Sequence, residues 1–210
     1  MMNDQLINLV IVDVQNDFMD DGVLPVKGGL KAASVIENYI EDHYDEIGIV
    51  ITSQDWHPKD HCSFVEQGGT FPPHCVKFTD GANYSFDLTL LRGLISFEVS
   101  KGTDKNEEKF SVFTNCFDAS NNYIVLEDPS DNAEHINLSK NDEYVVCGVA
   151  GDICVLETLK DMIKYIPVEN ITVLWYGTAS LDECTKLEQF CADNEIKIDY
   201  YGKEYEEISK

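Results

Sequence analysis

Apolar residues along the chain gather in short continuous runs, and polar or mixed segments separate one run from the next. The first run covers residues 6 to 14 and is rich in β-branched side chains, which is typical of a strand buried on both faces. Similar runs predict further strands at residues 47–53, 94–99, 144–149, 171–176 and 196–200.

Three segments between these runs carry apolar residues at helical spacing. The first predicts a helix over residues 30 to 43, and the third predicts one from Asp182 to about Asn194. The second begins at Asp152, which we expect to be its N-cap, and its apolar face would consist of Val155, Leu159, Met162 and Ile166. This alternation predicts an α/β fold, a single three-layer α/β/α domain over residues 1 to 210 with a mostly parallel central sheet.

Two regions depart from the alternation. Residues 57 to 93 are rich in Pro, Gly, His and Cys, and we expect a long functional loop with a short helix there. Residues 101 to 142 are polar, and we expect them to be irregular. The acidic stretch from 126 to 142 has no functional interpretation.

Composition narrows the class of partner and the compartment. With 15 Lys+Arg against 39 Asp+Glu, the formal net charge is −24, and such a surface repels nucleic acid and anionic bilayers. We therefore expect neither as a partner. The amino-terminal residues resemble no signal peptide, and no apolar stretch approaches the ~20 residues of a membrane span. We expect a cytoplasmic protein whose seven cysteines are reduced thiols.

Chemically reactive side chains follow four of the predicted strands. Asp13 ends the first strand, Asp55 and His57 follow the second, Lys101 follows the third, and Cys154 follows the fourth at the start of a helix. Ligands of an open parallel sheet bind beyond the carboxyl ends of its strands. The sequence therefore predicts one functional site at this edge of the sheet.

The acid and the two histidines of the long loop predict a metal site. Asp55 and His57 lie two residues apart on an extended segment, so both can reach one ion, and His74 between prolines could supply a third ligand. Carboxylate and imidazole suit Zn²⁺, Fe²⁺ or Mn²⁺, and three protein ligands leave room for water or substrate. The alternative is an ordinary polar surface loop. Further candidate ligands are His61, Ser63 and Glu66.

Cys154, Asp13 and Lys101 could form a nucleophilic site. Helix N-terminal N–H groups favour a thiolate at Cys154 and could hold an oxyanion. Burial at the end of an apolar strand would raise the pKa of Asp13 and make it a usable general base. Lys101 could orient that carboxylate. The plain alternatives are a structural cysteine, a turn-forming aspartate and a solvated lysine.

Five fragments, in order, carry a family resemblance: "VDVQNDF", "DWHP", "PPHCV", "SKG" and "GVAGDICV". Over roughly residues 6 to 200 the chain resembles the isochorismatase-like cysteine hydrolases, and among them the nicotinamidases, also called pyrazinamidases. The resemblance implies a catalytic triad of Asp13, Lys101 and Cys154. It also implies a divalent metal, with zinc favoured over iron or manganese, held by Asp55, His57 and His74.

The same resemblance implies a substrate and a reaction. Nicotinamide would be hydrolysed to nicotinic acid and ammonia through a Cys154 thioester, as part of NAD salvage, and pyrazinamide would also be accepted. A cis peptide between Val149 and Ala150 would turn the Ala150 N–H toward an oxyanion hole shared with Cys154. Phe18 and Phe71 would line the ring. The resemblance also allows a homo-oligomer.

Departures from the family leave rival interpretations. Phe71 stands where the family often has Trp, and Ile153 where it has an aromatic residue or His, so ring preference is open. Related hydrolases of ureido or carbamoyl compounds generally lack the metal residues, and isochorismatase proper usually lacks the cysteine. A catalytically silent binding protein on this fold is the rival of another class.

Overall fold

The computed structural model describes residues 6–119, 122–128 and 134–203. Its main sheet has six strands in the order β3-β2-β1-β7-β8-β9, and every neighbouring pair is parallel. This confirms the predicted α/β architecture, and each strand end lies within two residues of its predicted position. The strands are β1 (Ile7–Val12), β2 (Ile47–Asp55), β3 (Ile95–Lys101), β7 (Glu143–Gly148), β8 (Ile171–Thr178) and β9 (Lys197–Asp199).

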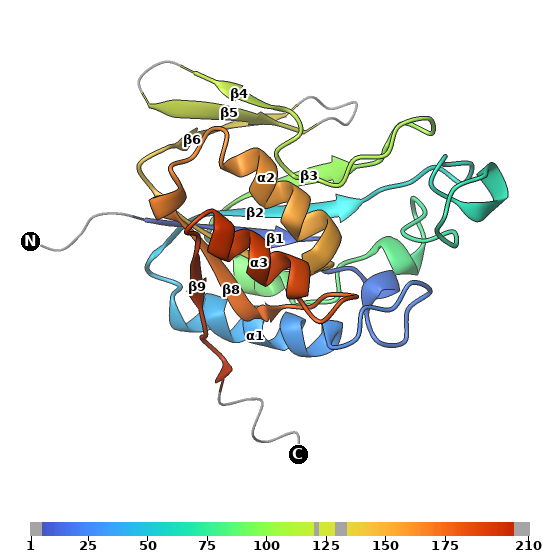
Figure 1. Ribbon diagram of the computed structural model, residues 1–210, viewed down its shortest axis with the longest axis horizontal. Helices are drawn as coiled ribbons and strands as arrows, with labels where there is room; N and C mark the ends of the chain where they lie inside the picture. The colour runs from blue at the N-terminus through green and yellow to red at the C-terminus, as the bar shows by residue number, and fades with distance from the viewer. Residues whose placement is uncertain (1–5, 120–121, 129–133, 204–210) are drawn as a thin grey trace, which may run out of the picture.

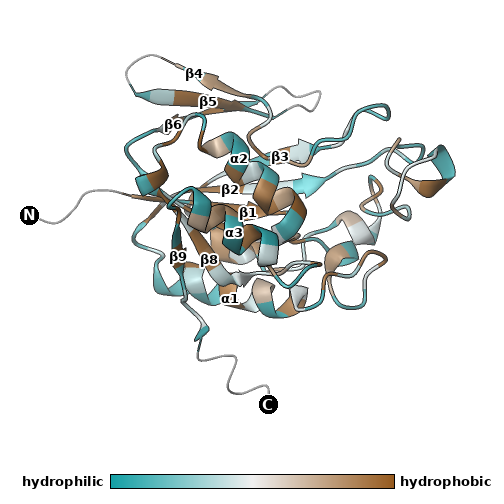
Figure 2. Ribbon diagram, in the orientation of Figure 1, coloured by the Kyte–Doolittle hydropathy of each residue, from teal (hydrophilic) through white to brown (hydrophobic). Residues whose placement is uncertain are grey.

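Helices cover both faces of this sheet (Figure 1). Helix α1 (Gly29–Asp42) lies on one face, and α2 (Leu156–Met162) and α3 (Thr185–Asp193) lie on the other. Strand β1 is buried throughout, and its side chains alternate between the two layers. Leu9 and Ile11 pack in the cluster that contains α1, whereas Val10 and Val12 pack with α2 and α3. Figure 2 shows the resulting apolar centre and the polar outer faces of the helices.

Strand order reverses at β1, and this reversal positions the site. From β1 the chain moves outward through β2 to β3, and it later returns to the other side of β1 as β7. Ligand sites in open parallel sheets form at such a switch point, beyond the carboxyl ends of the strands. The loops that follow β1 and β2 lie together at this edge (Figure 1).

The expectation of an irregular region from 101 to 142 is wrong in its second half. Three short strands, β4 (Cys116–Asp118), β5 (Tyr123–Glu127) and β6 (His135–Ser139), form a separate antiparallel sheet. Alternate residues point inward, so that Ile124, Leu126 and Leu138 are buried in the core while their neighbours along the strands are exposed or half-buried. Strands this short carry too few apolar positions to stand out in a polar sequence. Most of the acidic turn between β5 and β6 lies outside the described residues.

The helix after β7 begins differently from the prediction. A π-helical turn, η5 (Gly151–Val155), precedes α2, and Ala150 rather than Asp152 is its N-cap. The Asp152 carboxylate instead accepts a hydrogen bond from the Leu181 N–H, at 2.9 Å. The predicted apolar face is confirmed, since all four of its residues are buried: Val155, Leu159, Met162 and Ile166.

Short 3-10 turns make up the remaining helical structure. Three of them occupy the 57–93 region, where one short helix was expected, and α3 begins three residues later than predicted because residues 181–184 form a turn. None of the helices among the described residues is long and apolar enough to cross a membrane. The turns are η1 (Asn16–Phe18), η2 (Val65–Gln67), η3 (Asp80–Ala82), η4 (Leu88–Leu91) and η6 (Val168–Asn170).

Candidate active site

Four buried polar side chains meet at the carboxyl edge of the central strands. Asp13 directly follows β1 in a left-handed conformation, with φ of 49°, so the chain turns sharply there. Asp55 and Lys101 are the last residues of β2 and β3 and are paired in register. Cys154 lies in the π-helical turn after β7. Each of the four is at most 6% exposed.

Lys101 joins these side chains. Its Nζ lies 2.6 Å from Asp13 Oδ2, 2.8 Å from Asp55 Oδ1 and 3.7 Å from Cys154 Sγ. The Ser53 hydroxyl donates a hydrogen bond of 2.7 Å to Asp13 Oδ1. Asp13 is therefore fixed from two sides while it faces the thiol.

Burial and neighbouring charges set the protonation of this group. Burial raises the pKa of Asp13 to about 6, although the Lys101 charge opposes the shift. Burial favours the neutral amine of Lys101, but the charges of Asp13 and Asp55 outweigh it and raise the Lys101 pKa. Burial also raises the pKa of the Cys154 thiol well above its usual range. The expectation of a lowered thiol pKa is therefore wrong, because burial raises the pKa of Cys154 more than the Lys101 charge lowers it.

Asp55, His57 and His74 form a group that fits a metal ion. Asp55 Oδ2 lies 3.6 Å from His57 Nε2 and 3.8 Å from His74 Nε2. Two ligand atoms bound at about 2.1 Å to a tetrahedral ion lie about 3.4 Å apart, so these separations need little adjustment.

Hydrogen bonds determine which ring nitrogens of His57 and His74 face Asp55. His57 Nδ1–H donates to the Gly102 carbonyl at 3.0 Å, and His74 Nδ1–H donates to the Pro72 carbonyl at 2.8 Å. The Nε2 lone pairs of both rings therefore remain available to a metal ion, as in metal-binding histidines. His57 Nε2 is buried and lacks a hydrogen-bond partner among the described residues. A buried acceptor in this state is costly, and a cation would satisfy it.

The three further candidate ligands lie differently. The His61 ring stacks on the His57 ring with centroids 4.1 Å apart. Its Nδ1 accepts from the Ser63 hydroxyl at 2.7 Å, and its Nε2–H donates to the Glu107 carbonyl at 3.1 Å. Both ring nitrogens of His61 are therefore already hydrogen-bonded, one to the Ser63 hydroxyl and the other to a backbone carbonyl. Glu66 is exposed and lies outside the group.

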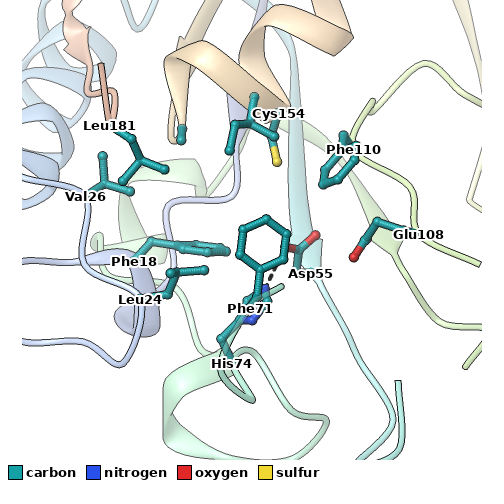
Figure 3. A pocket seen from close by; sticks show the side chains of 12 residues that line it. Phe18, Leu24, Val26, Asp55, Phe71, His74, Glu108, Phe110, Cys154 and Leu181 are labelled. Carbon is teal, nitrogen blue, oxygen red and sulfur yellow. Dashed lines mark ion pairs between the residues drawn. The ribbon is translucent and has the colours of Figure 1, made fainter. Parts of the chain in front are cut away.

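An apolar pocket opens beside these residues (Figure 3). The rings of Phe18 and Phe71 line it beside His74, with centroids 5.5 and 5.7 Å from the His74 ring. Ile153 also lines the pocket. Sequence reasoning missed the rest of the lining, because these residues occur in polar loops without periodicity: Leu24, Val26, Glu108, Phe110 and Leu181.

The turn between β7 and η5 supplies the backbone of the pocket wall. The peptide between Val149 and Ala150 is cis, as the resemblance implied. Ala150 and Cys154 both line the pocket. Gly151 packs so closely that an added Cβ would lie 2.2 Å from Ser180 Oγ. Small residues are therefore required where the chain passes behind the thiol.

Known proteins resemble this chain in sequence or in fold. No protein-family model matches the chain. The chain is 32% identical over 161 residues to a nicotinamidase/pyrazinamidase of Mycobacterium tuberculosis, which covers 74% of this chain and 78% of that protein. The pyrazinamidase of Pyrococcus horikoshii in complex with zinc superposes with a TM-score of 0.71 and 28% identity, over 92% of this chain and 98% of that one. An L. infantum protein in complex with nicotinate gives a TM-score of 0.69 and 25% identity, over 94% and 93%.

Proposed function

The chain belongs to the nicotinamidase family of isochorismatase-like cysteine hydrolases, and from this premise we propose that it hydrolyses nicotinamide to nicotinic acid and ammonia. The single observation that carries the proposal is the position of Lys101 Nζ. It contacts the general base Asp13, lies near the nucleophile Cys154, and binds Asp55, which faces two histidines. A cysteine amidase needs both a reactive thiol and a fixed substrate, and these residues can supply both in one pocket.

Asp13 and Cys154 carry the proton transfer and the attack. The Cys154 thiol is neutral at rest because its pKa is raised, so its proton must leave as the sulfur attacks. Asp13 takes that proton, since its raised pKa of about 6 makes it a stronger base than an ordinary aspartate while it stays ionised at neutral pH. The thiolate then adds to the carboxamide carbon. Lys101 keeps Asp13 in place and balances its charge.

The later steps use the backbone and the same carboxyl group. The N–H groups of Ala150 and Cys154 hold the oxyanion of the tetrahedral intermediate. Asp13 returns its proton to the departing ammonia, which leaves an acyl thioester on Cys154. Water, deprotonated by Asp13, hydrolyses the thioester and frees the thiol.

Asp55, His57 and His74 would hold a divalent metal ion, and zinc is the ion we propose. A zinc complex is known for the P. horikoshii relative, and carboxylate and imidazole ligands suit this ion. Such an ion would supply Lewis-acid chemistry, and the pyridine nitrogen of nicotinamide is the substrate atom that could use it. The rings of Phe18 and Phe71 confine the flat substrate, so its carboxamide meets Cys154.

Substrate comparison tests this function against hydrolysis of ureido or carbamoyl compounds. Ammonia release from nicotinamide, pyrazinamide and an N-carbamoyl amino acid would be measured with one preparation of the metal-loaded protein. We expect kcat/KM for the two ring amides to exceed that for the carbamoyl compound by at least 100-fold. Faster hydrolysis of the carbamoyl compound would overturn the proposal.

We place the reaction in NAD salvage in a reducing compartment, the cytoplasm. Within the described residues all seven cysteines are free thiols, and the nucleophile itself must stay reduced. Immunoblots of cell fractions would test the location, and enrichment in an exported or membrane fraction would contradict it.

A further inference from the structure

Gln15 is a buried polar residue that takes no part in the mechanism proposed above. It is fully buried, and it is absent from the lining of the substrate pocket. Burying an amide costs free energy unless all its hydrogen-bonding groups find partners. Its contacts therefore indicate what it stabilises.

The Gln15 side chain binds both backbone groups of one residue, Asp55. Gln15 Oε1 accepts a 2.8 Å hydrogen bond from the Asp55 N–H, and Gln15 Nε2 donates to the Asp55 carbonyl at 2.9 Å. A second donation from Nε2, also at 2.9 Å, reaches the carbonyl of Ala82 in η3. Two opposed bonds to the same residue fix its backbone as a neighbouring strand would.

The end of β1 explains why a side chain takes this role. Strand β1 pairs with β2 as far as Ile11 and Thr52, and the Asp13 N–H then bonds to the Ser53 carbonyl at 3.2 Å. At Asp13 the chain turns away, so β2 extends beyond its neighbour on this side. The Gln15 amide pairs with the Asp55 backbone N–H and carbonyl, which β1 does not reach, and so extends the hydrogen-bond ladder by one residue.

Asp55 is the residue whose orientation matters most in this site. Its Oδ1 lies 2.8 Å from Lys101 Nζ, while its Oδ2 faces the Nε2 atoms of His57 and His74. A small rotation of the Asp55 backbone would misdirect both oxygens. We propose that Gln15 is a positioning residue that fixes Asp55, so that one carboxylate serves Lys101 and the metal ion together. The inference rests on the metal site proposed above.

The two histidines are held by other contacts. His57 is oriented by Gly102, and its N–H donates to the Cys75 carbonyl at 3.0 Å. The Cys75 N–H donates in turn to Asp17 Oδ2 at 2.7 Å, which fixes the loop that carries His74. Loss of the Gln15 amide should therefore disturb one metal ligand and leave the histidine pair in place.

The test is the Zn²⁺ affinity of purified variants, measured by competition with a chromogenic chelator and without nicotinamide. Gln15→Met keeps the side-chain length and removes all three hydrogen bonds, and Gln15→Asn keeps an amide that is too short to span to Asp55. We expect both to bind Zn²⁺ 10- to 100-fold more weakly than the parent protein, the usual effect of losing a contact that orients a metal ligand. Gln15→Asn decides the matter if Gln15→Met does not fold.

The matched control is Asn8→Leu. Asn8 is a buried amide at the opposite end of β1, and its Nδ2 donates to Asp142 Oδ2 at 3.2 Å. The Asn8→Leu substitution should lower the midpoint of thermal unfolding of the metal-free protein but change Zn²⁺ affinity less than twofold. A folded Gln15 variant whose affinity matches that of Asn8→Leu would overturn the inference. Failure of the parent protein to bind Zn²⁺ would overturn the metal site as well, whereas tight binding without nicotinamide hydrolysis would count only against the proposed function.

Discussion

Lys101 Nζ and Asp55 Oδ1 lie 2.8 Å apart at the ends of two neighbouring strands, and both side chains are buried. The pair joins the two halves of the site. Asp55 presents its other oxygen to the histidines, and Lys101 contacts Asp13 on the nucleophile's side. Any change to Lys101 should therefore affect catalysis and metal binding together.

Replacement of this lysine by methionine should abolish most of the activity. Lys101→Met leaves Asp13 and Asp55 buried without their cation, and breaking a buried ion pair costs about 3–5 kcal/mol. We expect kcat/KM for nicotinamide to fall at least 100-fold, with weaker Zn²⁺ binding. The control is Lys105→Met, whose ion pair with Asp60 is more than half exposed and should matter little. Equal effects of the two variants would contradict the assigned role.

Removal of the nucleophile should separate chemistry from metal binding. Cys154→Ala should lower kcat at least 10³-fold and leave Zn²⁺ affinity unchanged, because the sulfur is not a member of the Asp55, His57 and His74 group. Cys191→Ala, at a buried cysteine of α3, should keep its activity. Rapid-quench experiments on the parent protein, followed by mass spectrometry, should show an acyl adduct on Cys154. More than a tenth of the activity in Cys154→Ala would count against covalent catalysis.

The pH profile should report Asp13. Its carboxylate is the active form, and its pKa is about 6, so kcat/KM should fall tenfold per pH unit as the pH drops below that value. Burial raises the Cys154 pKa, so thiol ionisation should add no step near neutral pH. Asp13→Asn should be inactive throughout. An acid limb centred near pH 4, the ordinary aspartate value, would show that burial does not control this group.

The pocket wall should act on substrate binding more than on chemistry. Phe71→Ala removes a ring that lines the pocket and lies against His74. We expect KM for nicotinamide to rise about fivefold or more, which corresponds to about 1 kcal/mol of lost aromatic contact, and kcat to change less. Phe71→Trp should restore binding. Phe117→Ala, at a half-exposed ring of β4, is the control. A fall in kcat without a rise in KM would contradict this role.

Sequence patterns predicted the central sheet because each of its strands falls on a short segment rich in apolar residues, bounded by polar ones. The motif residues at the strand ends were found for the same reason, since a buried run that stops at Asp13 or Asp55 marks the carboxyl edge. The β4–β6 sheet was missed because its strands are short and face the core on one side only. Pocket residues such as Glu108 and Phe110 lie in the polar segment before β4 and show no hydrophobic periodicity.

Other features depend on tertiary contacts that a sequence does not display. The raised pKa of the Cys154 thiol follows from burial by several elements, whereas its place at a helix start suggested the opposite shift. Asp152 is not the N-cap, because a π-helical turn that begins at Gly151 has Ala150 in that position. Gln15 stands two residues after Asp13 in the first motif, and only the folded structure shows its hydrogen bonds to the Asp55 backbone.

Metal dependence of ammonia release from nicotinamide tests at once whether the protein is a nicotinamidase and whether it needs the ion. The purified protein would be assayed as prepared, after chelation, and after restoration with Zn²⁺, with Cys154→Ala carried through the same three states. We expect release to disappear on chelation, to return with the ion, and to be absent in Cys154→Ala throughout. Undiminished release from fully metal-free protein, or no release from metal-loaded protein with a reactive Cys154, would contradict it.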